Sequence, residues 1–379
     1  MQKRKQPVRA SSQNAVLNRI LKNGAVEKGV DMFQRLSDAE TEITKWYSTT
    51  VPVVDVILTG KVGRGFPASR LVELYGEMHC GKTTLGCLTL AEVQRNAGVA
   101  VLWDTENTFT EGRAQQLGVD ANTILYASAE YVEHVFEGID RVLSTVAATP
   151  AVIFWDTIAG TCVFAEQSRT YTESGGIAGH ARALSTGFRR IGPMLSQTNV
   201  CIVACNQLKV AGIGTTFATD RVKEGTIGGS AIKFHSHIRL RVRAGKKYQG
   251  ILPGMKKKVH IGEEVNAMVT KDKNGPSDVL GRGAILVLRK IGPSAGRFAN
   301  GLSVLRTLQK WKALSDGDSV SFAGVKYTAA KWEEKYDTDP AFQNATHAFL
   351  EVVNARLLRT GVPQAVDTTV PEDEDDLFN

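Results

Sequence analysis

One short segment constrains the fold of this chain more than any other. Residues 76–83 read Gly-Glu-Met-His-Cys-Gly-Lys-Thr and fit the pattern G-x-x-x-x-G-K-[ST] in every fixed position. An apolar run, Leu71–Tyr75, precedes the segment, and a helical pattern follows it to about Gly98. A strand, a glycine turn and a helix in this order place backbone N–H groups and a helix N-terminus around phosphate oxygens. The segment therefore predicts a phosphate-binding loop in an α/β domain.

The residue types in this loop indicate which part of a nucleotide each one contacts. Lys82 is expected to reach the β- and γ-phosphates of ATP, and the Thr83 hydroxyl is expected to bind Mg²⁺. Magnesium also needs a carboxylate at the end of a neighbouring strand, and Asp156 follows the apolar run Ala151–Trp155. Any apolar strand that ends in Asp gives this pattern, so the loop is what favours Asp156 as a metal ligand. The predicted ATP-binding residues of the loop are Gly76, Glu77, His79, Cys80, Gly81, Lys82, Thr83 and Thr84.

Two further strand ends carry groups that ATP hydrolysis uses. Glu106 follows the run Val99–Trp103 and can orient the attacking water, although a solvated loop carboxylate or a helix-capping acid gives the same pattern. Gln207 follows the run Val200–Cys205, and a polar side chain at that place can sense the γ-phosphate. We therefore take Glu106 and Gln207, together with Lys82, as candidate catalytic residues.

Apolar runs alternate with amphipathic stretches over residues 50–300, and Ala284–Leu288 is the last of these runs. The alternation predicts an α/β fold with a mostly parallel sheet flanked by helices. Ahead of it, Val16, Leu17, Ile20 and Leu21 share one face of a predicted helix. The expected organisation is an N-terminal helical arm (residues 1–47), an ATPase core (48–302), a small C-terminal domain (303–362) and a disordered acidic tail (363–379).

Composition narrows the class of protein. The chain has no apolar run of about eighteen residues and no apolar leader after its basic N-terminus, so we expect a cytoplasmic protein without a membrane span. Its five cysteines lie mostly in apolar runs and are expected to be reduced core residues. The net charge of +7 includes the acidic run Glu372–Asp376, so the rest of the chain is more basic still. A basic body suits a nucleic-acid partner, although solubility alone explains the charge equally well.

Two polar, glycine-containing segments interrupt the core and are candidate DNA-binding loops. The segment Leu208–Gly229 shows neither a helical nor a strand period, and Glu166–Gly179 is similar. Basic loops beside a nucleotide sensor fit contacts with the phosphates of single-stranded DNA, although plain surface loops remain an alternative. Arg239, Arg241 and Arg243 alternate along a strand, where a solvated face explains them as well as DNA does. The candidate DNA contacts of the two segments and of the helix after the second are Lys209, Arg221, Lys223, Arg182 and Arg189.

The order of these elements resembles the ATPase core of the RecA-type recombinases over roughly residues 48–300. The resemblance includes the entrance to the core, Ser48–Asp55, then Gly65–Pro67 and Arg70–Gly76. It also includes Asp104-Thr105-Glu106 with Leu117–Asp120, the strand ending in Gln207, and the run Gly228-Gly229-Ser230-Ala231-Ile232-Lys233-Phe234. The pattern is closer to a divergent, UvsX-like phage member than to a bacterial housekeeping one.

The resemblance implies an ATP-dependent recombinase that forms a helical filament of identical subunits on single-stranded DNA and pairs it with homologous duplex DNA. ATP and Mg²⁺ would be its cofactors, and single-strand-binding or loading proteins are further expected partners. ATP would lie between subunits, so that Lys271 and Lys273 of one subunit complete the site of the next. The N-terminal arm would contact a neighbouring subunit, as would Lys233 and Phe234. Gly228, Gly229 and Ser230 would contact DNA.

Some residues depart from the family pattern. Arg113 stands where bacterial members place an aromatic residue against adenine, and its guanidinium plane is a candidate for the same contact. Thr157 stands where serine is usual.

Two other functions fit the same residues: a DNA- and ATP-binding filament or mediator protein without strand exchange, and a hexameric helicase-like ATPase. The paired lysines and the arm favour a filament over a closed ring.

Overall fold

The computed structural model describes residues 15–21, 25–26, 30–31, 35, 37, 42–146, 148–164, 177–210, 224–250, 257–273, 283–317 and 319–360. The chain forms two units, Met1–Thr44 and Lys45–Asn379. In the first unit, residues 15–21 are helical, and β1 (Ala25–Val26) pairs with β2 (Val30–Asp31) in antiparallel fashion. The apolar side chains of Val16, Leu17 and Ile20 are exposed on this helix.

A single sheet forms the centre of the second unit, and nine of the described strands take part in it. Its strands are β5 (Arg70–Gly76), β6 (Val99–Asp104), β7 (Ile124–Ala127), β8 (Ala151–Asp156), β9 (Val200–Val210), β10 (Glu224–Thr226), β11 (Ile238–Gly250), β12 (Val259–Asp272) and β13 (Gly283–Arg289). Their order is β13-β12-β11-β5-β9-β8-β6-β7, with β10 against β9. The strands from β11 to β7 in this order are parallel, whereas β12 is antiparallel to both its neighbours.

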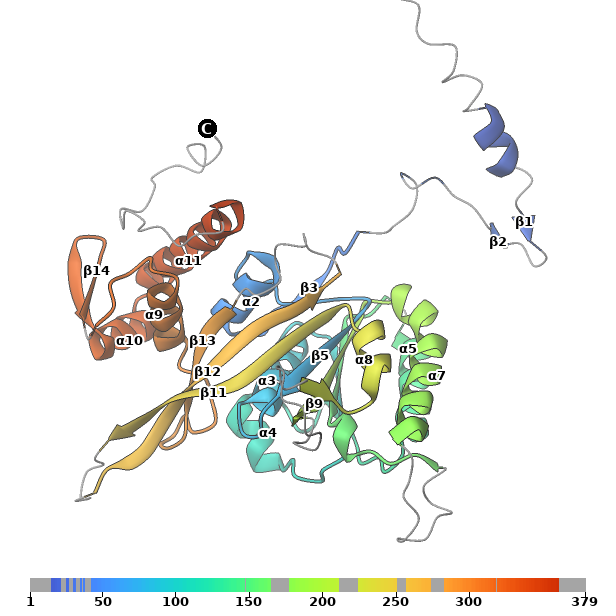
Figure 1. The fold of residues 1–379 in the computed structure, drawn as a ribbon, viewed down its shortest axis with the longest axis horizontal. Coiled ribbons are helices and arrows are strands. Elements are labelled where there is room, and N and C mark those ends of the chain that lie inside the picture. Colours follow the sequence, from blue (N-terminus) through green and yellow to red (C-terminus); the bar gives the residue numbers. More distant parts are fainter. Residues whose placement is uncertain are drawn as a thin grey trace, which may run out of the picture. The chain divides into compact units, whose positions relative to one another are not determined.

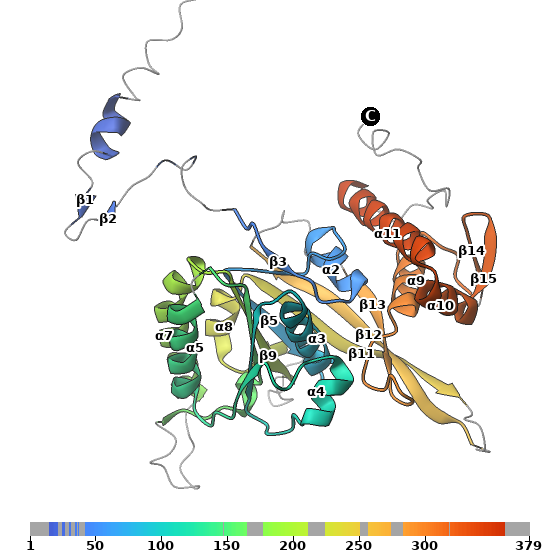
Figure 2. The same cartoon turned by 180° about the vertical axis from the view of Figure 1, so that it is seen from behind.

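Helices cover both faces of the sheet (Figures 1 and 2). On one face lie α3 (Lys82–Arg95) and α4 (Glu111–Leu117), and on the other lie α5 (Val132–Val146), α7 (Ile177–Ser196) and α8 (Gly229–His235). The strands supply apolar side chains to both layers because they are buried on both faces. Phe154 of β8 packs into the layer of α3, and the adjacent Trp155 packs into the layer of α5 and α7.

The entrance to the core and the C-terminal part pack on the same side as α3. The entrance holds β3 (Trp46–Tyr47), α2 (Pro52–Thr59) and β4 (Phe66–Pro67), and a 3₁₀ turn, η2 (Ile158–Gly160), follows β8. The C-terminal part consists of α9 (Asn300–Lys310), β14 (Ser319–Phe322), β15 (Val325–Thr328), α10 (Ala329–Thr338) and α11 (Pro340–Thr360). Phe322 and Trp332 bury their rings in the same apolar cluster as α2 and α3. Among the described residues, no helix is both long and apolar enough to cross a membrane.

The α/β fold with a mostly parallel sheet is confirmed, but three details differ from the sequence analysis. The segment Leu208–Gly229 is not without regular structure, because Leu208–Val210 prolong β9 and pair with β10. Ile177 to Gly179 belong to α7 and not to a loop. Arg239 is not on a solvated face, because its side chain is 11% exposed and pairs with buried Glu73. The remaining loop residues, 165–176 and 211–223, and the acidic tail from 361 onward lie outside the described residues.

Candidate nucleotide-binding site

A cavity of about 410 Å³ opens at the edge where the parallel strands end. Parallel strands bring their carboxyl ends to one edge of a sheet, and ligands of open α/β sheets bind there. Four strand ends and the turn after β13 contribute to this cavity, as does α4. Its lining residues are Met78, His79, Gly81, Lys82, Thr83, Thr84, Glu106, Arg113, Asp156, Thr157, Gln207, Leu288, Arg289, Lys290 and Gly296.

The loop between β5 and α3 needs glycine at both of its ends. A Cβ atom on Gly76 would lie 1.8 Å from the carbonyl oxygen of Val242, so that no side chain fits. Gly81 caps α3 in the left-handed conformation with φ 79°, and its Cβ would lie 2.7 Å from the ring of Phe298. The loop therefore keeps its backbone tight against β11 and leaves the N-terminus of α3 open to an anionic group.

Lys82, Thr83 and Asp156 meet at the floor of the cavity. The ammonium of Lys82 donates to the carbonyl oxygens of Glu77 at 2.6 Å and of Gly76 at 3.3 Å, so it lies within its own loop. The Thr83 hydroxyl donates to Asp156 Oδ2 at 2.6 Å. Burial raises the pKa of Asp156 to about 6, and the bond from Thr83 opposes that rise. A hydroxyl and a carboxylate so close together form the oxygen donor set that Mg²⁺ prefers, so these residues fit that metal.

Glu106 and Gln207 line the same cavity, and hydrogen bonds fix the turn and the strand that carry them. The buried carboxylate of Asp104 accepts from the backbone N–H groups of Glu106 at 3.2 Å and of Phe109 at 2.8 Å. Thr157, after a cis peptide bond to Asp156, donates its hydroxyl to the carbonyl of Cys205 at 3.0 Å. The Asp104 bonds thus fix the turn after β6 that carries Glu106, and the Thr157 bond joins the residue after β8 to β9, which carries Gln207.

Arg113, for which a contact with the base was predicted, also lines the cavity. Its guanidinium donates to Thr84 Oγ1 at 3.1 Å and to Gln116 Oε1 at 2.8 Å. Thr84 in turn donates to the carbonyl of Gly296 at 2.9 Å. These bonds hold the turn after β13 against α3.

Sequence reasoning missed the turn after β13. Lys290 lines the cavity, donates to the carbonyl of His79 at 3.2 Å and pairs with Glu263 at 2.6 Å. The strand β13 runs in the same direction as β5, because both β11 and β13 are antiparallel to β12. A glycine- and proline-containing turn, residues 291–296, two basic residues after an apolar run was the available signal.

The candidate DNA-binding residues fall partly outside the described part of the chain. Arg221 and Lys223 are among the residues not described, and nor is the side chain of Lys209. Arg182 and Arg189 are exposed on α7, and Ser230 is exposed in the first turn of α8. Gly228 and Gly229 begin α8 against α7, since their Cβ atoms would lie 2.4 Å from Leu184 and 3.8 Å from Ala181. The structure thus places the start of α8 beside the helix that carries Arg182.

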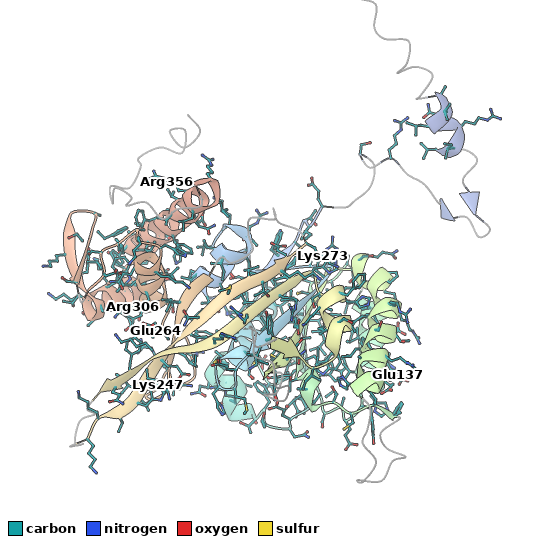
Figure 3. The ribbon with its side chains drawn as sticks, viewed as in Figure 1. Glu137, Lys247, Glu264, Lys273, Arg306 and Arg356 are labelled. Atoms are coloured by element: carbon teal, nitrogen blue, oxygen red, sulfur yellow. The ribbon has the colours of Figure 1, made fainter. Side chains whose placement is uncertain are left out.

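The predicted interface lysines lie away from this chain's own cavity. Lys271 lies at the end of β12 and Lys273 directly after it, beside the start of β11, whereas Lys247 lies toward the other end of the β11–β12 pair (Figure 3). Lys271 donates to the carbonyls of Lys233 and Phe234, and Lys273 donates to that of Phe234 at 2.9 Å. Burial and the nearby charge of Lys273 lower the pKa of Lys271 to about 8. Both lysines therefore bind the C-terminal carbonyls of α8 within one chain.

No cluster of three or more His, Cys, Asp or Glu suited to a metal occurs among the described residues.

The sequence is similar to that of known proteins. A model of the RecA N-terminal domain family matches residues 15–280, which is more than half of the chain. Protein RecA of Prochlorococcus marinus (strain MIT 9211) is 31% identical over 242 residues, covering 63% of this chain and 62% of that protein. Protein RecA of Synechococcus sp. (strain WH7803) is 32% identical over 240 residues, covering 62% of this chain and 59% of that protein. The chain thus spans about three fifths of the length of these relatives. Protein RecA of Parasynechococcus marenigrum (strain WH8102) is 31% identical over 274 residues, covering 71% and 68%. This chain belongs to the RecA family.

Proposed function

We propose that this protein is an ATP-dependent recombinase that assembles on single-stranded DNA and pairs it with a homologous duplex. The observation that carries the proposal is the cavity itself, which brings Lys82, Thr83, Asp156, Glu106 and Gln207 to one edge of the sheet in a chain of the RecA family. The likeness to UvsX-like phage members stays a prediction.

The residues of the cavity divide the work of ATP hydrolysis. Lys82 and the N-terminus of α3 bind the phosphate oxygens, while Thr83 and Asp156 hold Mg²⁺. The metal, when bound, neutralises charge that develops on the phosphates. Glu106 orients the water whose oxygen attacks the γ-phosphorus, so that ADP leaves and inorganic phosphate forms. Gln207 contacts the γ-phosphate and registers its presence.

DNA and a second subunit complete this proposed cycle. Arg182, Arg189 and the first turn of α8 supply cations and backbone N–H groups for DNA phosphates. Phe234 is 72% exposed, and the ammonium of Lys273 lies 5.3 Å from the centre of its ring, which makes a surface suited to a neighbouring chain. Lys271 and Lys273 would reach the phosphates held by that neighbour, in the manner of an arginine finger.

The proposal is tested with the full chain, by measuring ATP turnover with and without single-stranded DNA and by a D-loop assay. We expect DNA to stimulate turnover and D-loops to form only with ATP. Glu106→Gln should lower DNA-stimulated turnover by roughly 10²-fold or more while ATP binding persists. Glu111→Gln, in the exposed first turn of α4, is the matched control and should behave as wild type. DNA-stimulated turnover without D-loops would instead indicate a mediator. Rings without filaments in electron microscopy would indicate a helicase-like ATPase.

A further inference from the structure

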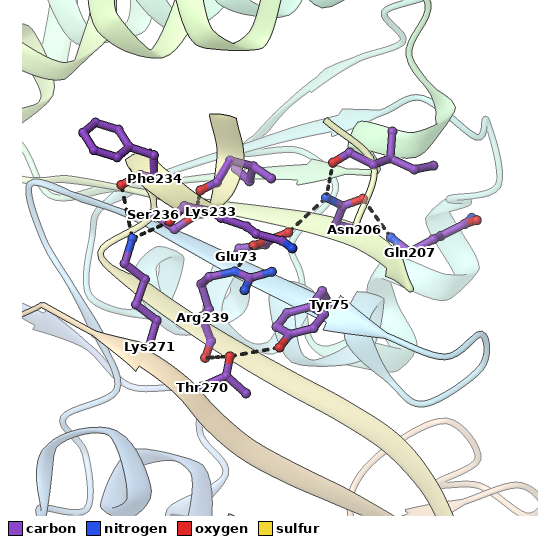
Figure 4. Close-up of polar contacts among 12 residues, drawn as sticks. Glu73, Tyr75, Asn206, Gln207, Lys233, Phe234, Ser236, Arg239, Thr270 and Lys271 are labelled. Atoms are coloured by element: carbon purple, nitrogen blue, oxygen red, sulfur yellow. Dashed lines mark hydrogen bonds and ion pairs between the residues drawn. The ribbon is translucent and has the colours of Figure 1, made fainter. Parts of the chain in front are cut away.

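A row of buried polar side chains crosses the sheet between the nucleotide cavity and α8 (Figure 4). At its centre is Glu73 of β5, whose side chain is fully buried. One carboxylate oxygen accepts from Asn206 Nδ2 at 3.0 Å, and the other accepts from Arg239 Nε. The neighbouring strand positions on this face carry apolar groups such as Leu71 and Ala204. Glu73 is therefore a buried carboxylate with apolar neighbours along its own strand and beside it, and both of its oxygens accept hydrogen bonds.

On one side of Glu73, the amide of Asn206 connects three parts of the chain. Its Oδ1 accepts from the backbone N–H of Gln207 at 2.9 Å, and its Nδ2 donates to the carbonyl of Ile227 at 2.9 Å as well as to Glu73. Gln207 lines the nucleotide cavity, and Ile227 lies two residues before α8. Because Asn206 is fully buried, a displacement of Gln207 must either move the Asn206 amide or break its bond.

On the other side, Arg239 extends the row to the lysine that binds the end of α8. Its guanidinium stacks over the ring of Tyr75 at 4.3 Å, and the Tyr75 hydroxyl donates to Thr270 at 3.0 Å. The Thr270 hydroxyl returns to the carbonyl of Arg239 at 3.1 Å. Lys271 follows directly and donates to the carbonyls at the C-terminal end of α8. Both ends of α8 are thus connected to Glu73.

We propose that Glu73 is a positioning residue that couples Gln207 to α8. A buried ion pair is weak grounds for a role in stability, since apolar replacements of similar volume are often equally stable. Here the role of Glu73 is to orient a neighbouring side chain. Glu73 holds the Asn206 amide with its oxygen toward Gln207 and its nitrogen toward Ile227, so that contact of Gln207 with the γ-phosphate moves the start of α8. This inference rests on the proposed function, because it assigns the route by which the nucleotide site and the proposed DNA-binding residues of α8 influence each other.

Two double variants separate positioning from structure. Glu73→Leu with Arg239→Met removes both charges and the carboxylate that accepts from Asn206, which keeps only its bond to the carbonyl of Ile227. Glu73→Gln with Arg239→Gln also removes the ion pair but keeps an oxygen that accepts from Asn206. Asn206→Ala supplies an independent test, because it leaves Glu73 and Arg239 in place. Thermal melting, ATP binding, and kcat and KM for ATP with and without single-stranded DNA are measured for each full-length variant.

We expect the Leu/Met variant and Asn206→Ala to lose about tenfold in DNA-stimulated kcat, with KM for ATP and DNA-free turnover unchanged. The Gln/Gln variant should regain most of the stimulation. Equal stimulation in wild type and Asn206→Ala would overturn the proposal, whatever the folding of the double variants. An equal loss of DNA-stimulated kcat in the two double variants would overturn the proposal as well. The loss would then follow from removal of the ion pair and not from removal of the oxygen that accepts from Asn206. Absence of DNA stimulation in the wild type would count against the proposed function itself.

Discussion

Asp55 shows how one buried carboxylate organises the entrance to the core. It accepts four hydrogen bonds, from the Ser48 hydroxyl at 2.7 Å, from the Thr49 N–H at 2.9 Å and hydroxyl at 2.6 Å, and from the Gly63 N–H at 3.0 Å. These bonds join the chain before α2 to the turn after it. Burial raises the pKa of Asp55 to about 6, although the four donors oppose the rise. The side chain thus orders two segments at the cost of placing a charge in the core.

Removal of this carboxylate should destabilise the fold. In Asp55→Ala the buried N–H and hydroxyl of Thr49 lose this acceptor, and each unsatisfied buried group costs about 1–3 kcal/mol, so we expect a loss of about 3 kcal/mol in urea unfolding at pH 7. Asp140→Ala, which breaks the exposed pair with Arg190, is the control and should lose less than about 1 kcal/mol. A loss at Asp55 no larger than that of the control would contradict the assignment.

The same variant has a predicted pH dependence. The pKa of Asp55 is about 6 in the folded state against an ordinary 3.8, so the folded state binds more protons than the unfolded state between these values. The stability that Asp55 contributes therefore falls as pH rises from about 4 to about 6 and is constant above that. The stability gap between wild type and Asp55→Ala should be widest near pH 4 and should narrow toward pH 6. A gap that widens over this range would refute the raised pKa.

At the level of elements, α8 is a short helix whose first residues pack against α7 and whose last carbonyls accept hydrogen bonds from two lysines. Gly228 and Gly229 begin it against α7, and Lys271 and Lys273 bind its last carbonyls. Cations favour the C-terminal end of a helix, where carbonyls lack intrahelical partners. The two lysines would have to leave these carbonyls to reach a neighbour's phosphates. Filament assembly would then loosen the end of α8 in each subunit that donates its lysines.

Lys271→Met tests this dual role of the lysine. Methionine keeps the unbranched stem but removes the charge, so we expect ATP binding to remain and DNA-stimulated turnover to fall by about tenfold or more. Amide exchange at the C-terminal end of α8 should also become faster, because two carbonyls lose a donor. Lys312→Met, which breaks an exposed pair with Asp316, is the control and should change neither measurement. Turnover equal to wild type would argue against a catalytic role for Lys271.

The elements also show how far sequence reasoning reached. Strand ends could be read from apolar runs, and parallel pairing then placed Glu106, Asp156 and Gln207 at one edge, because ends of parallel strands converge. The partners of Glu73 could not be read in this way. Asn206 and Arg239 lie on strands 133 and 166 residues away in sequence, and only the strand order brings them together. The hairpin of β14 and β15 was missed because its four-residue strands carry too few apolar positions to show a period.

At the scale of the whole molecule, two surfaces besides that of Phe234 and Lys273 are suited to a second copy of the chain. The helix at residues 15–21 exposes Val16, Leu17 and Ile20 on one face, and it belongs to the first unit, whereas the residues of the cavity belong to the second. In the second unit, β7 is an edge strand of the sheet, and its Leu125 and Tyr126 are exposed. Open edges and apolar helical faces both favour association with another chain. We therefore expect assembly, and not nucleotide binding, to depend on the arm.

Leu17→Glu with Ile20→Glu tests this dependence in the full-length chain. Two charges on the apolar face should prevent docking on a neighbour, so filaments on single-stranded DNA should disappear in electron microscopy and DNA-stimulated turnover should fall by about tenfold or more. ATP binding by the separate subunit should persist, because Lys82, Thr83 and Asp156 all lie in the other unit. Asn18→Glu adds one charge to the polar side of the same helix, and filaments should survive it. Filaments of normal length in the double variant would mean that subunits join through the core alone, and the edge of β7 would then be the surface to alter.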